Sequence, residues 1–557
     1  GRPAHRLGLA LRPSGPMPEA LRHWFGALLR PYPVPLRWAA VLFFALGLLV
    51  QWWRLASFTA SFDQALFYQV LWSTWQGHPF ESTLSSELSA AVTVHDLPPQ
   101  LGYLHIAQHS NLLTLLAAPL LPLLGLWTLP LLQVLLLTAA GLVLFRMAQD
   151  ALPEPLAVRL AVSYFAAGTV IGPLVENYHD LCAIPLLGFL LIRSLLKHHW
   201  GSTLLWLVLL CLVRQDAGIT AFSIGLWALV RCPGSRRQGL VVMIYSVAYV
   251  ALLTAVVQPQ FGADLSDRFM QEKFAPFMAG REGGGTLALL QSMLQQPGLV
   301  LQELLSPPGR TLTFLLAIAL PLALIPLRSV DVGLLIAAPL FVPLVSQGMS
   351  ALSVTLRYVM FLVPALFAGT MLWWRAHLLL FQRRGFRRCW TGALALSLVL
   401  TLTSNPYRSF SALIPDSFDP WVHVSIPGML RRAATAREMV DLVPPLASVA
   451  ADTPLLPRLA GREVALRYPR NDTYRDRDGQ VRPVDWIAAF PAYYHPYRQV
   501  FKTERGVERA LRERTREQLT SGRYGVVACR DGAFVLRRQV PSKPELAGCM
   551  HRALADS

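Results

Sequence analysis

The stretch WAAVLFFALGLLVQWW, from Trp38 to Trp53, contains no charged side chain and is bounded by Arg37 and Arg54. An apolar run of this length is typical of a helix that crosses a lipid bilayer, because such a helix satisfies its own backbone hydrogen bonds. Segment 1–37 before it is rich in arginine. The positive-inside rule therefore predicts a cytoplasmic basic N-terminal segment followed by an uncleaved signal-anchor helix.

Similar apolar runs recur as far as Leu402, and the whole chain is 54% hydrophobic but only 15% charged. Soluble domains carry about 25% charged residues, so we expect lipid to cover these runs. Arginine clusters beside the runs explain the net charge of +17 and argue against nucleic-acid binding. We predict an α-helical polytopic membrane protein with about 11 transmembrane helices. The expected spans are about Trp38–Trp53, Leu129–Phe145, Leu160–Leu174, Pro185–Arg193, Leu204–Leu212, Ala217–Arg231, Leu240–Val257, Thr311–Leu327, Val332–Val345, Val354–Trp373 and Thr391–Leu402.

The apolar run Leu112–Leu126 stands directly before the span Leu129–Phe145. Only one net crossing fits between Gln108, outside, and Arg146, inside. We therefore expect Leu112–Leu126 to be re-entrant or interfacial.

The same charge rule divides the chain into three parts. A transmembrane domain covers 38–404, with external loops at 54–108 and 258–310, and 405–557 is an extracytoplasmic soluble α/β domain. Its strand-like runs are Ala447–Ala451, Glu463–Tyr468, Trp486–Phe490 and Gly525–Cys529, and Glu504–Gln518 has helical spacing. In an oxidising compartment Cys529 and Cys549 are compatible with a disulfide, although the sequence leaves their geometry open.

Polar residues gather on the outer loops, close to helix ends. Ser61–Gly77 has the pattern of an amphipathic helix on the outer membrane face, with Asp63 in its first turn. Asp63 either complements the helix dipole or acts as a catalytic carboxylate. His105 and His109 are four residues apart, which is a metal-ligand spacing, but we favour solvated loop histidines there.

Three further polar motifs adjoin apolar runs: Glu176–Asp180, Arg214–Asp216 and the dipeptide Arg357–Tyr358. Charged groups at such depth are costly unless they are paired or face water. Arg214 and Asp216 fit either a pair that closes a loop or a pocket that holds an anion. The same two interpretations apply to Arg357.

Several motifs keep the order of a known family: SFDQALFYQVLW (61–72), HSNLL from His109, ENYHDLCAIPLL (176–187), VRQDAGIT (213–220) and LRYVMFLVPAL (356–366). Together with ASVAADTPLLPRLAGREVALRYP (447–469), they resemble an uncharacterised bacterial membrane family, domain of unknown function family 2079. That family in turn resembles the GT-C membrane glycosyltransferases, which implies a GT-C-like fold. GT-C enzymes use polyprenyl-phosphate sugars and carry an acidic residue in the first external loop, and Asp63 matches that position.

The chain departs from the expected pattern at three places. The first external loop has no Asp-Asp or Asp-Glu pair beside Asp63. Gln215 stands where the family usually has Glu, and Leu181 follows Asp180 where the family shows a His-Pro-Glu motif. A divalent cation remains compatible with the sequence, but no clear ligand set is present.

The resemblance and the polar motifs together predict transfer of a sugar from a polyprenyl-phosphate donor to a glycan, lipid or protein at the outer face of a bacterial inner membrane. Asp63 is the expected general base, and Arg214 and Arg357 are expected to hold the phosphate. The other expected substrate-binding residues of this outward-facing pocket are Gln64, His109, His179, Asp180, Asp216 and Tyr358. A transporter or flippase of lipid-linked substrates and a non-catalytic membrane scaffold are the alternatives.

Overall fold

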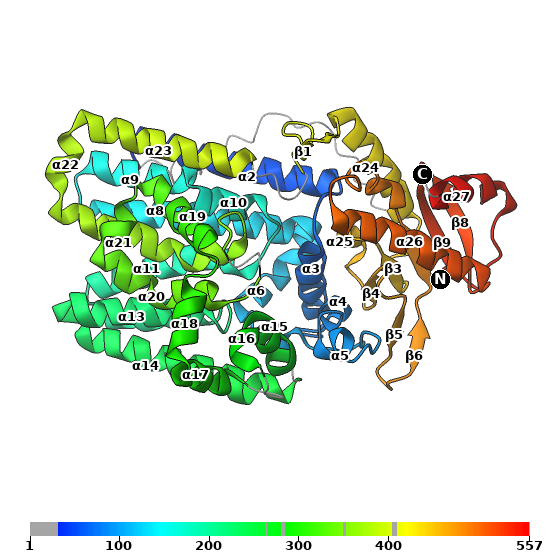
Figure 1. Cartoon of the computed structure of the whole chain (residues 1–557), viewed down its shortest axis with the longest axis horizontal. Coiled ribbons are helices and arrows are strands. Elements are labelled where there is room, and N and C mark those ends of the chain that lie inside the picture. The colour runs from blue at the N-terminus through cyan, green and yellow to red at the C-terminus, as the bar shows by residue number, and fades with distance from the viewer. Residues whose placement is uncertain (1–31, 263, 280–284, 349–351, 404–408, 556–557) are drawn as a thin grey trace.

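The computed structural model describes residues 32–262, 264–279, 285–348, 352–403 and 409–555. A long bundle of helices carries a smaller C-terminal domain against one of its ends (Figure 1). The predicted architecture, a helical membrane protein with a small C-terminal region containing a β-sheet, is confirmed at this level. Most of the predicted basic segment 1–37 lies outside the described residues.

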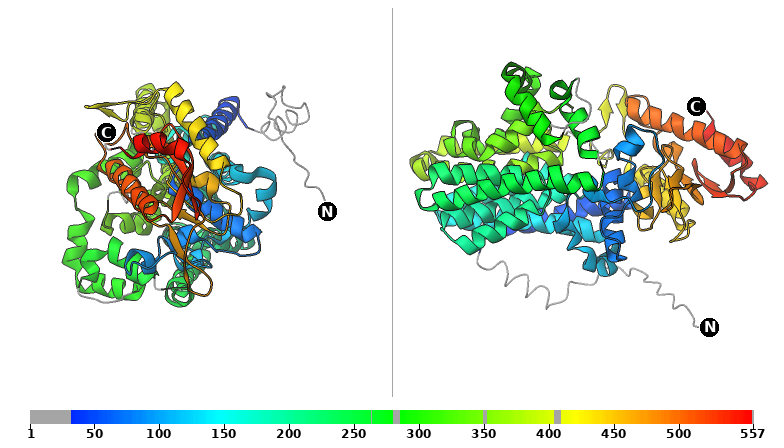
Figure 2. Two further views of the ribbon diagram at one scale, coloured as in Figure 1. Left: turned by 90° about the vertical axis from the view of Figure 1, so that its right-hand side faces the viewer. Right: turned by 90° about the horizontal axis from the view of Figure 1, so that it is seen from below.

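The helices of the bundle run approximately along its long axis (Figures 1 and 2). They are α2 (Val34–Ala56), α8 (Thr128–Gln149), the consecutive α9 (Glu154–Ala166) and α10 (Gly168–Val175), α11 (Ile184–Leu196), α12 (Trp200–Cys211), α13 (Ala217–Arg231), α14 (Arg236–Leu252), α19 (Pro308–Ala319), α20 (Val330–Val345), α21 (Val363–Ala376) and α23 (Arg384–Thr403), with α22 (Leu378–Gln382) between the last two.

Among the described residues, four helical stretches are long and apolar enough to cross a membrane. They are Val34–Ala56, Leu112–Gln149, Glu154–Val175 and Pro233–Gln260, and the bent pair Pro297–Leu304 and Pro308–Leu322 would make a fifth. The predicted number of about 11 spans is therefore not confirmed. Several of the expected spans form shorter helices, and Pro339 and Pro343 lie inside α20.

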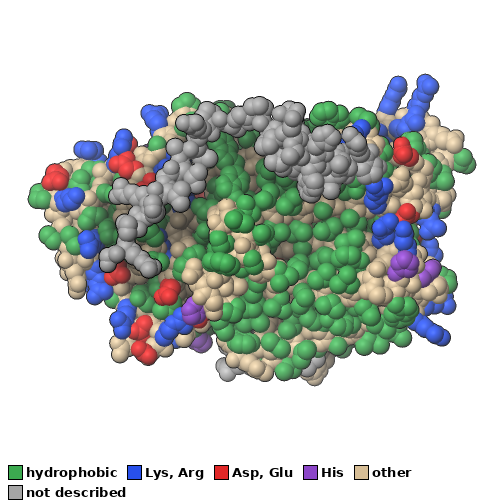
Figure 3. Space-filling view, turned by 180° about the vertical axis from the view of Figure 1, so that it is seen from behind, with side chains coloured by type: hydrophobic (Ala, Val, Ile, Leu, Met, Phe, Trp, Pro, Cys, Tyr) green, Lys and Arg blue, Asp and Glu red, His purple; other side chains and the backbone are tan. Residues whose placement is uncertain are grey.

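On the face shown in Figure 3, a belt of apolar side chains covers the bundle, and charged side chains flank it on both sides. Large apolar residues of α14, among them Leu240, Ile244 and Val247, are exposed within the structure. Because isolated exposed apolar residues are common but a continuous belt is not, lipid must cover this surface.

The two ends of the bundle differ in their ion pairs. At one end, which we call the basic end, Asp150 pairs with Arg193 at 3.2 Å and Lys197 at 3.0 Å, and Arg231 pairs with Asp331. The other end adjoins the C-terminal domain, and we call it the domain end. It contains the end of α10 and the turn between α12 and α13.

The apolar run Leu112–Leu126 contains only one-turn helices, α6 (Leu112–Leu115) and α7 (Leu121–Leu124), joined by 3₁₀ turns. Gly125 has φ +52°, which ends α7 before the regular helix α8 begins. The sequence did not predict these breaks, and the re-entrant or interfacial path of the run stays a prediction.

The predicted external loop 258–310 is largely helical. It forms α15 (Gln271–Lys273), α16 (Ala275–Met278), α17 (Thr286–Gln295) and α18 (Pro297–Leu304). Phe277 and Met278 are buried in a small apolar cluster with Val345 of α20.

The C-terminal domain contains a five-stranded sheet with strand order β4-β3-β7-β9-β8. Strands β4, β3 and β7 are parallel, and β9 is antiparallel to β7 and β8. The strands and helices of this domain are α24 (Ile426–Asp441), β3 (Val449–Ala451), α25 (Leu456–Leu459), β4 (Ala465–Arg467), β7 (Trp486–Ala489), α26 (Lys502–Thr520), β8 (Tyr524–Arg530), β9 (Ala533–Arg538) and α27 (Ala547–Leu554), with the small pairs β1 (Ser417–Phe418) with β2 (Trp421–Val422) and β5 (Thr473–Arg475) with β6 (Val481–Pro483). The four expected strands and the expected helix are confirmed, whereas α24 and β9 were not predicted.

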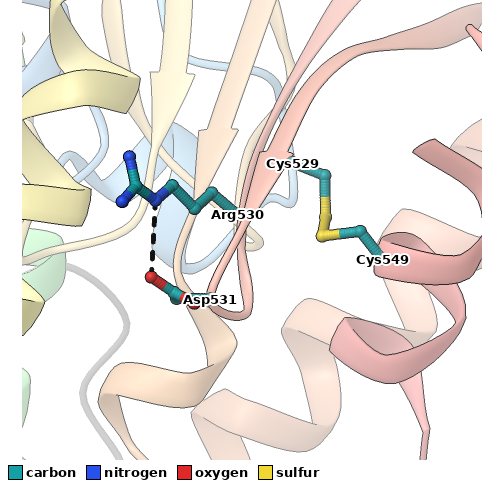
Figure 4. Close-up of a disulfide and its surroundings, with 4 residues drawn as sticks. All are labelled: Cys529, Arg530, Asp531 and Cys549. Atoms are coloured by element: carbon teal, nitrogen blue, oxygen red, sulfur yellow. Dashed lines mark ion pairs between the residues drawn. A yellow bond between two sulfur atoms is a disulfide. The ribbon is translucent and has the colours of Figure 1, made fainter. Parts of the chain in front are cut away.

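A disulfide joins Cys529 of β8 to Cys549 of α27, with the Cα atoms 6.0 Å apart (Figure 4). The sequence could not decide whether this disulfide forms, and the structure contains it. It fastens the last helix to the edge strand of the sheet, next to the Arg530–Asp531 pair at 3.5 Å.

Candidate functional site

Asp63 lies in the first turn of α3 (Phe62–Trp75), a helix placed across the domain end of the bundle (Figure 1). Phe62, Leu66 and Val70 of α3 are buried, and Gly461 of the C-terminal domain packs against Tyr68. The predicted helix is confirmed, and its position relative to the membrane surface stays a prediction. The apolar side chains of α3 are buried between the bundle and the C-terminal domain.

Asp63 forms an ion pair with Arg357, which is shared with a second carboxylate. Nη1 of Arg357 donates to Oδ2 of Asp63 and, at 2.9 Å, to Oε1 of Glu176. The backbone N–H of Arg357 also donates to Oε2 of Glu176 at 2.7 Å. Glu176 is nearly buried, whereas 30% of the Asp63 side chain remains exposed. Glu176 therefore fixes the arginine, whereas Asp63 and Arg357, whose side chain is 22% exposed, are the members of the trio that a substrate can reach.

Arg214 lies in the turn between α12 and α13 and is paired with two aspartates. Its Nε and Nη2 donate to the two carboxylate oxygens of Asp216, each at 2.7 Å, and its Nη1 is 3.7 Å from Asp180. Only 5% of its side chain is exposed. The predicted loop-closing pair is present, so Arg214 has little capacity left to bind a ligand anion.

Gln215, between those two residues, ties the turn to the segment before α6. Its Oε1 accepts from the Ser110 backbone N–H at 3.0 Å, and its Nε2 donates to the Gln108 carbonyl at 3.2 Å and lies 3.1 Å from Nδ1 of His109. A neutral amide can make all three contacts, whereas a carboxylate could not donate. The departure from the family pattern at Gln215 thus has a structural role.

His105 is buried and lies in the 3₁₀ turn His105–Ala107, and His109 lies just beyond this turn. Nδ1 of His105 lies 2.9 Å from the Ser85 hydroxyl, and the His105 ring meets the ring of His109 edge to face at 5.9 Å between centroids. Burial and the nearby Arg214 lower the pKa of His105 to about 4. The interpretation as a solvated loop histidine is therefore wrong for His105.

A cavity opens beside these ion pairs. Its polar lining consists of Asp216, Lys273, Ser346, Gln347 and Tyr358, and Ile219, Phe361 and apolar residues of α20 supply the rest. The ammonium group of Lys273 lies 5.5 Å from the centre of the Tyr358 ring. Lys273 was missed in the sequence because it lies in the poorly patterned 258–310 segment.

A second cavity is mostly apolar and is lined by residues from the 112–126 run together with Tyr178 and Asp180. Asp63, His179 and Arg357 line neither of these two cavities. Neither of these two cavities is lined by all the motifs, as we had expected of a single pocket. The ion pairs of Arg214 and Arg357 nevertheless bring the motifs together at the domain end.

The remaining expected substrate-binding residues are mostly buried. Oε1 of Gln64 accepts from the Tyr178 backbone N–H at 3.4 Å, and the His179 backbone N–H donates to Gln133 at 3.3 Å. Both ring nitrogens of His179 are buried and have no hydrogen-bond partner within the described part of the chain. His179 and Gln64 therefore pack beneath the surface of the site and contribute to its structure.

The C-terminal domain also reaches the site, through Arg467 at the end of β4. Its guanidinium lies 4.4 Å from the centre of the Phe62 ring, next to Asp63. Its backbone N–H donates to Oε1 of Glu87 at 2.7 Å, and Asn471 donates to the same oxygen at 3.0 Å. Burial raises the pKa of Glu87 to about 7.

Glu87 and Glu176 are the two carboxylates that sequence reasoning undervalued. Glu87 stands in the serine-rich segment ESTLSSEL (81–88), which has the composition of an exposed loop, yet its side chain is fully buried. No local pattern reveals this, because its partners Arg467 and Asn471 are distant in sequence. Within the described residues, no group of three or more His, Cys, Asp or Glu side chains is arranged to hold a metal ion.

Comparison with known proteins identifies a class and then a family. The apolar belt and the helical bundle define a multi-pass membrane protein. The chain belongs to the family described as predicted membrane protein DUF2079, whose model matches residues 54–535.

No curated protein matches the chain significantly. Among solved structures, the chain is similar to ArnT from Cupriavidus metallidurans bound to undecaprenyl phosphate. The identity is 13% and the TM-score 0.44, with 90% of this chain and 99% of that chain covered.

Proposed function

We propose that the protein transfers a sugar from a polyprenyl-phosphate donor, with the reaction at the domain end of the bundle. The observation that carries this proposal is the trio Asp63, Arg357 and Glu176. It combines a fixed arginine with one reachable carboxylate beside a cavity that has both cationic and apolar walls.

Each part of this arrangement suits one requirement of the reaction. The apolar residues of α20 along the cavity would contact the isoprenoid, and Lys273 with Arg357 would bind its phosphate. As the sugar–phosphate bond breaks, the leaving phosphate gains negative charge, which these two cations would stabilise. Arg214 would instead shape the turn, because Asp180 and Asp216 already occupy it.

Asp63 would be the general base. An acceptor hydroxyl is a poor nucleophile, so a carboxylate must take its proton as the new glycosidic bond forms. In the structure Asp63 pairs with Arg357. Binding of the donor phosphate to Arg357 would weaken that pair and leave the carboxylate available to the acceptor.

Binding of a short-chain polyprenyl phosphate to the purified protein in neutral detergent tests the proposal. We expect R357Q and K273Q each to weaken binding by roughly tenfold. K502Q is the matched control, because Lys502 is exposed at the start of α26. Equal binding of the uncharged polyprenol, or unchanged binding by both site variants, would contradict the proposal.

A lipid transporter is the second candidate function, and the mostly apolar cavity beside the 112–126 run favours it. It is distinguished by the product: a transporter moves the labelled lipid across a vesicle membrane without cleaving the sugar–phosphate bond.

A further inference from the structure

One face of α26 carries a stripe of arginines. Arg505, Arg509, Arg512 and Arg516 follow one another at spacings of four, three and four residues, which places them on the same side of the helix. At a rise of about 1.5 Å per residue the stripe is about 16 Å long.

The stripe forms one wall of an open groove. The preceding loop supplies Arg498 and Gln499 to the lining, and α26 also contributes Glu508 and Glu513. Five arginines against two glutamates leave the lining strongly positive.

The base of the groove is fixed by buried ion pairs. Glu508, which is 2% exposed, accepts from Arg512 at 2.7 Å and lies 3.7 Å from Arg498. Nε of Arg512 is buried and has no hydrogen-bond partner in the part of the chain that the structure describes. Arg505 donates to the carbonyls of Arg498 and Gln499, at 2.9 and 3.1 Å, which holds the loop against the helix. The groove is therefore a built feature rather than a set of loose surface side chains.

The lining selects a class of ligand. It contains only Arg, Glu and Gln side chains and no aromatic ring on which a nucleobase could stack. Guanidinium groups match the geometry of phosphate and carboxylate oxygens, to which they donate paired hydrogen bonds. A stripe of this length would contact several anionic groups of one extended molecule.

Because of the direction of α26, its arginine stripe lies away from the lipid headgroups. The helix begins where Val500 and Phe501 share an apolar cluster with Trp53 of α2, and from there it runs away from the bundle (Figures 1 and 2). We propose that the groove binds an extended anionic polymer, a glycan chain that carries phosphate or carboxylate groups. This inference does not depend on the proposed sugar transfer.

Titration of the full chain in phosphatidylcholine nanodiscs with linear inorganic polyphosphate tests the inference. R509Q removes one cation from the lining, and we expect roughly tenfold weaker binding. E513Q removes a repelling charge, and we expect about twofold tighter binding. Both side chains are exposed on the helix, so neither variant should disturb the fold.

Matched controls are R431Q and E545Q, which change the same charges at exposed positions elsewhere on the domain. If R509Q and E513Q bind polyphosphate as these controls do, the inference is wrong. Competition by orthophosphate at equal phosphate concentration would reduce the groove to a single-anion site and overturn the polymer proposal. Loss of polyphosphate binding in nanodiscs containing phosphatidylglycerol would assign the groove to lipid headgroups instead.

Discussion

Asp63 is the residue on which the proposed chemistry depends. Asn at this position keeps the shape and an oxygen acceptor for Arg357, but it cannot take a proton. We expect D63N to lower sugar transfer from a polyprenyl-phosphate sugar by about a hundredfold or more while donor binding is retained. The measurement is single-turnover transfer of a labelled sugar, and a normal rate in D63N would exclude Asp63 as the base.

Glu87 should make the stability of the protein depend on pH. Burial raises its pKa from 4.5 to about 7. Between these values the unfolded chain has lost the proton that the folded chain keeps, so this contribution to the free energy of unfolding falls as pH rises from about 4.5 to 7. We expect the thermal midpoint of the wild type to decline relative to E87Q across that window.

The control for this effect is E81Q, because Glu81 forms an accessible pair with Arg477. If the difference in thermal midpoint between the wild type and E87Q stays constant from pH 4.5 to 7.5, Glu87 titrates in the folded protein as it does in water.

At the scale of single residues, the sequence predicted best where a pairing is local. Asp216 lies two residues from Arg214, and their pair could be anticipated. Glu176 and Arg357 are distant in sequence, so their contact depends on the packing of whole helices. Glu87 is harder still, because its burial requires the C-terminal domain to dock.

Among the elements, the contact between α13 and α14 depends on two glycines. A Cβ atom on Gly225 would lie 2.7 Å from the Gly239 carbonyl oxygen. This oxygen belongs to the backbone of α14, so it cannot move away without shifting the helix. We expect G225A to lower the thermal midpoint by several degrees, because the helices must separate. G392A is the control: nothing lies within 4 Å of that position in α23, and alanine favours a helix. Equal midpoints for the two variants would contradict this account.

The disulfide fixes α27 to β8. It closes a loop with a sequence separation of 20 residues, so its removal should cost the C-terminal domain about 3 kcal/mol. The test compares proteolysis of the C-terminal domain in the wild type and in a C529S/C549S double variant. We expect the variant to be cut faster near α27, and equal cleavage rates would show that packing alone holds the helix.

Elements were predictable where one physical rule dominates. The short apolar run Trp486–Phe490 predicted β7, and the helical spacing of Glu504–Gln518 predicted α26. α3 showed the limit of the approach, because an apolar helix face looks the same whether lipid or protein will cover it. The short helices α6 and α7 also escaped prediction, since apolar length says nothing about where a helix breaks.

For the whole molecule, the arginine clusters predict that the basic end lies in the cytoplasm and the C-terminal domain outside. A reporter enzyme that works only outside the cytoplasm, fused after Ser557, should therefore be active. A reporter fused within the Arg383–Arg388 cluster should be inactive. The reverse pattern would invert the predicted topology.

The docking of the C-terminal domain on α3 also has a consequence for how the protein is made. Gln69 of α3 donates to the carbonyl of Arg462 at 3.0 Å, across 393 residues of sequence, and Thr83 donates to Ala465 at 2.8 Å. A ribosome releases α3 long before it synthesises these partners. During most of translation the C-terminal domain therefore does not yet cover the face of α3 that it buries in the finished protein. A prematurely terminated chain would keep Asp63 but lack the contacts that hold its helix, and cellular proteases could recognise that bare surface as the mark of an unfinished protein.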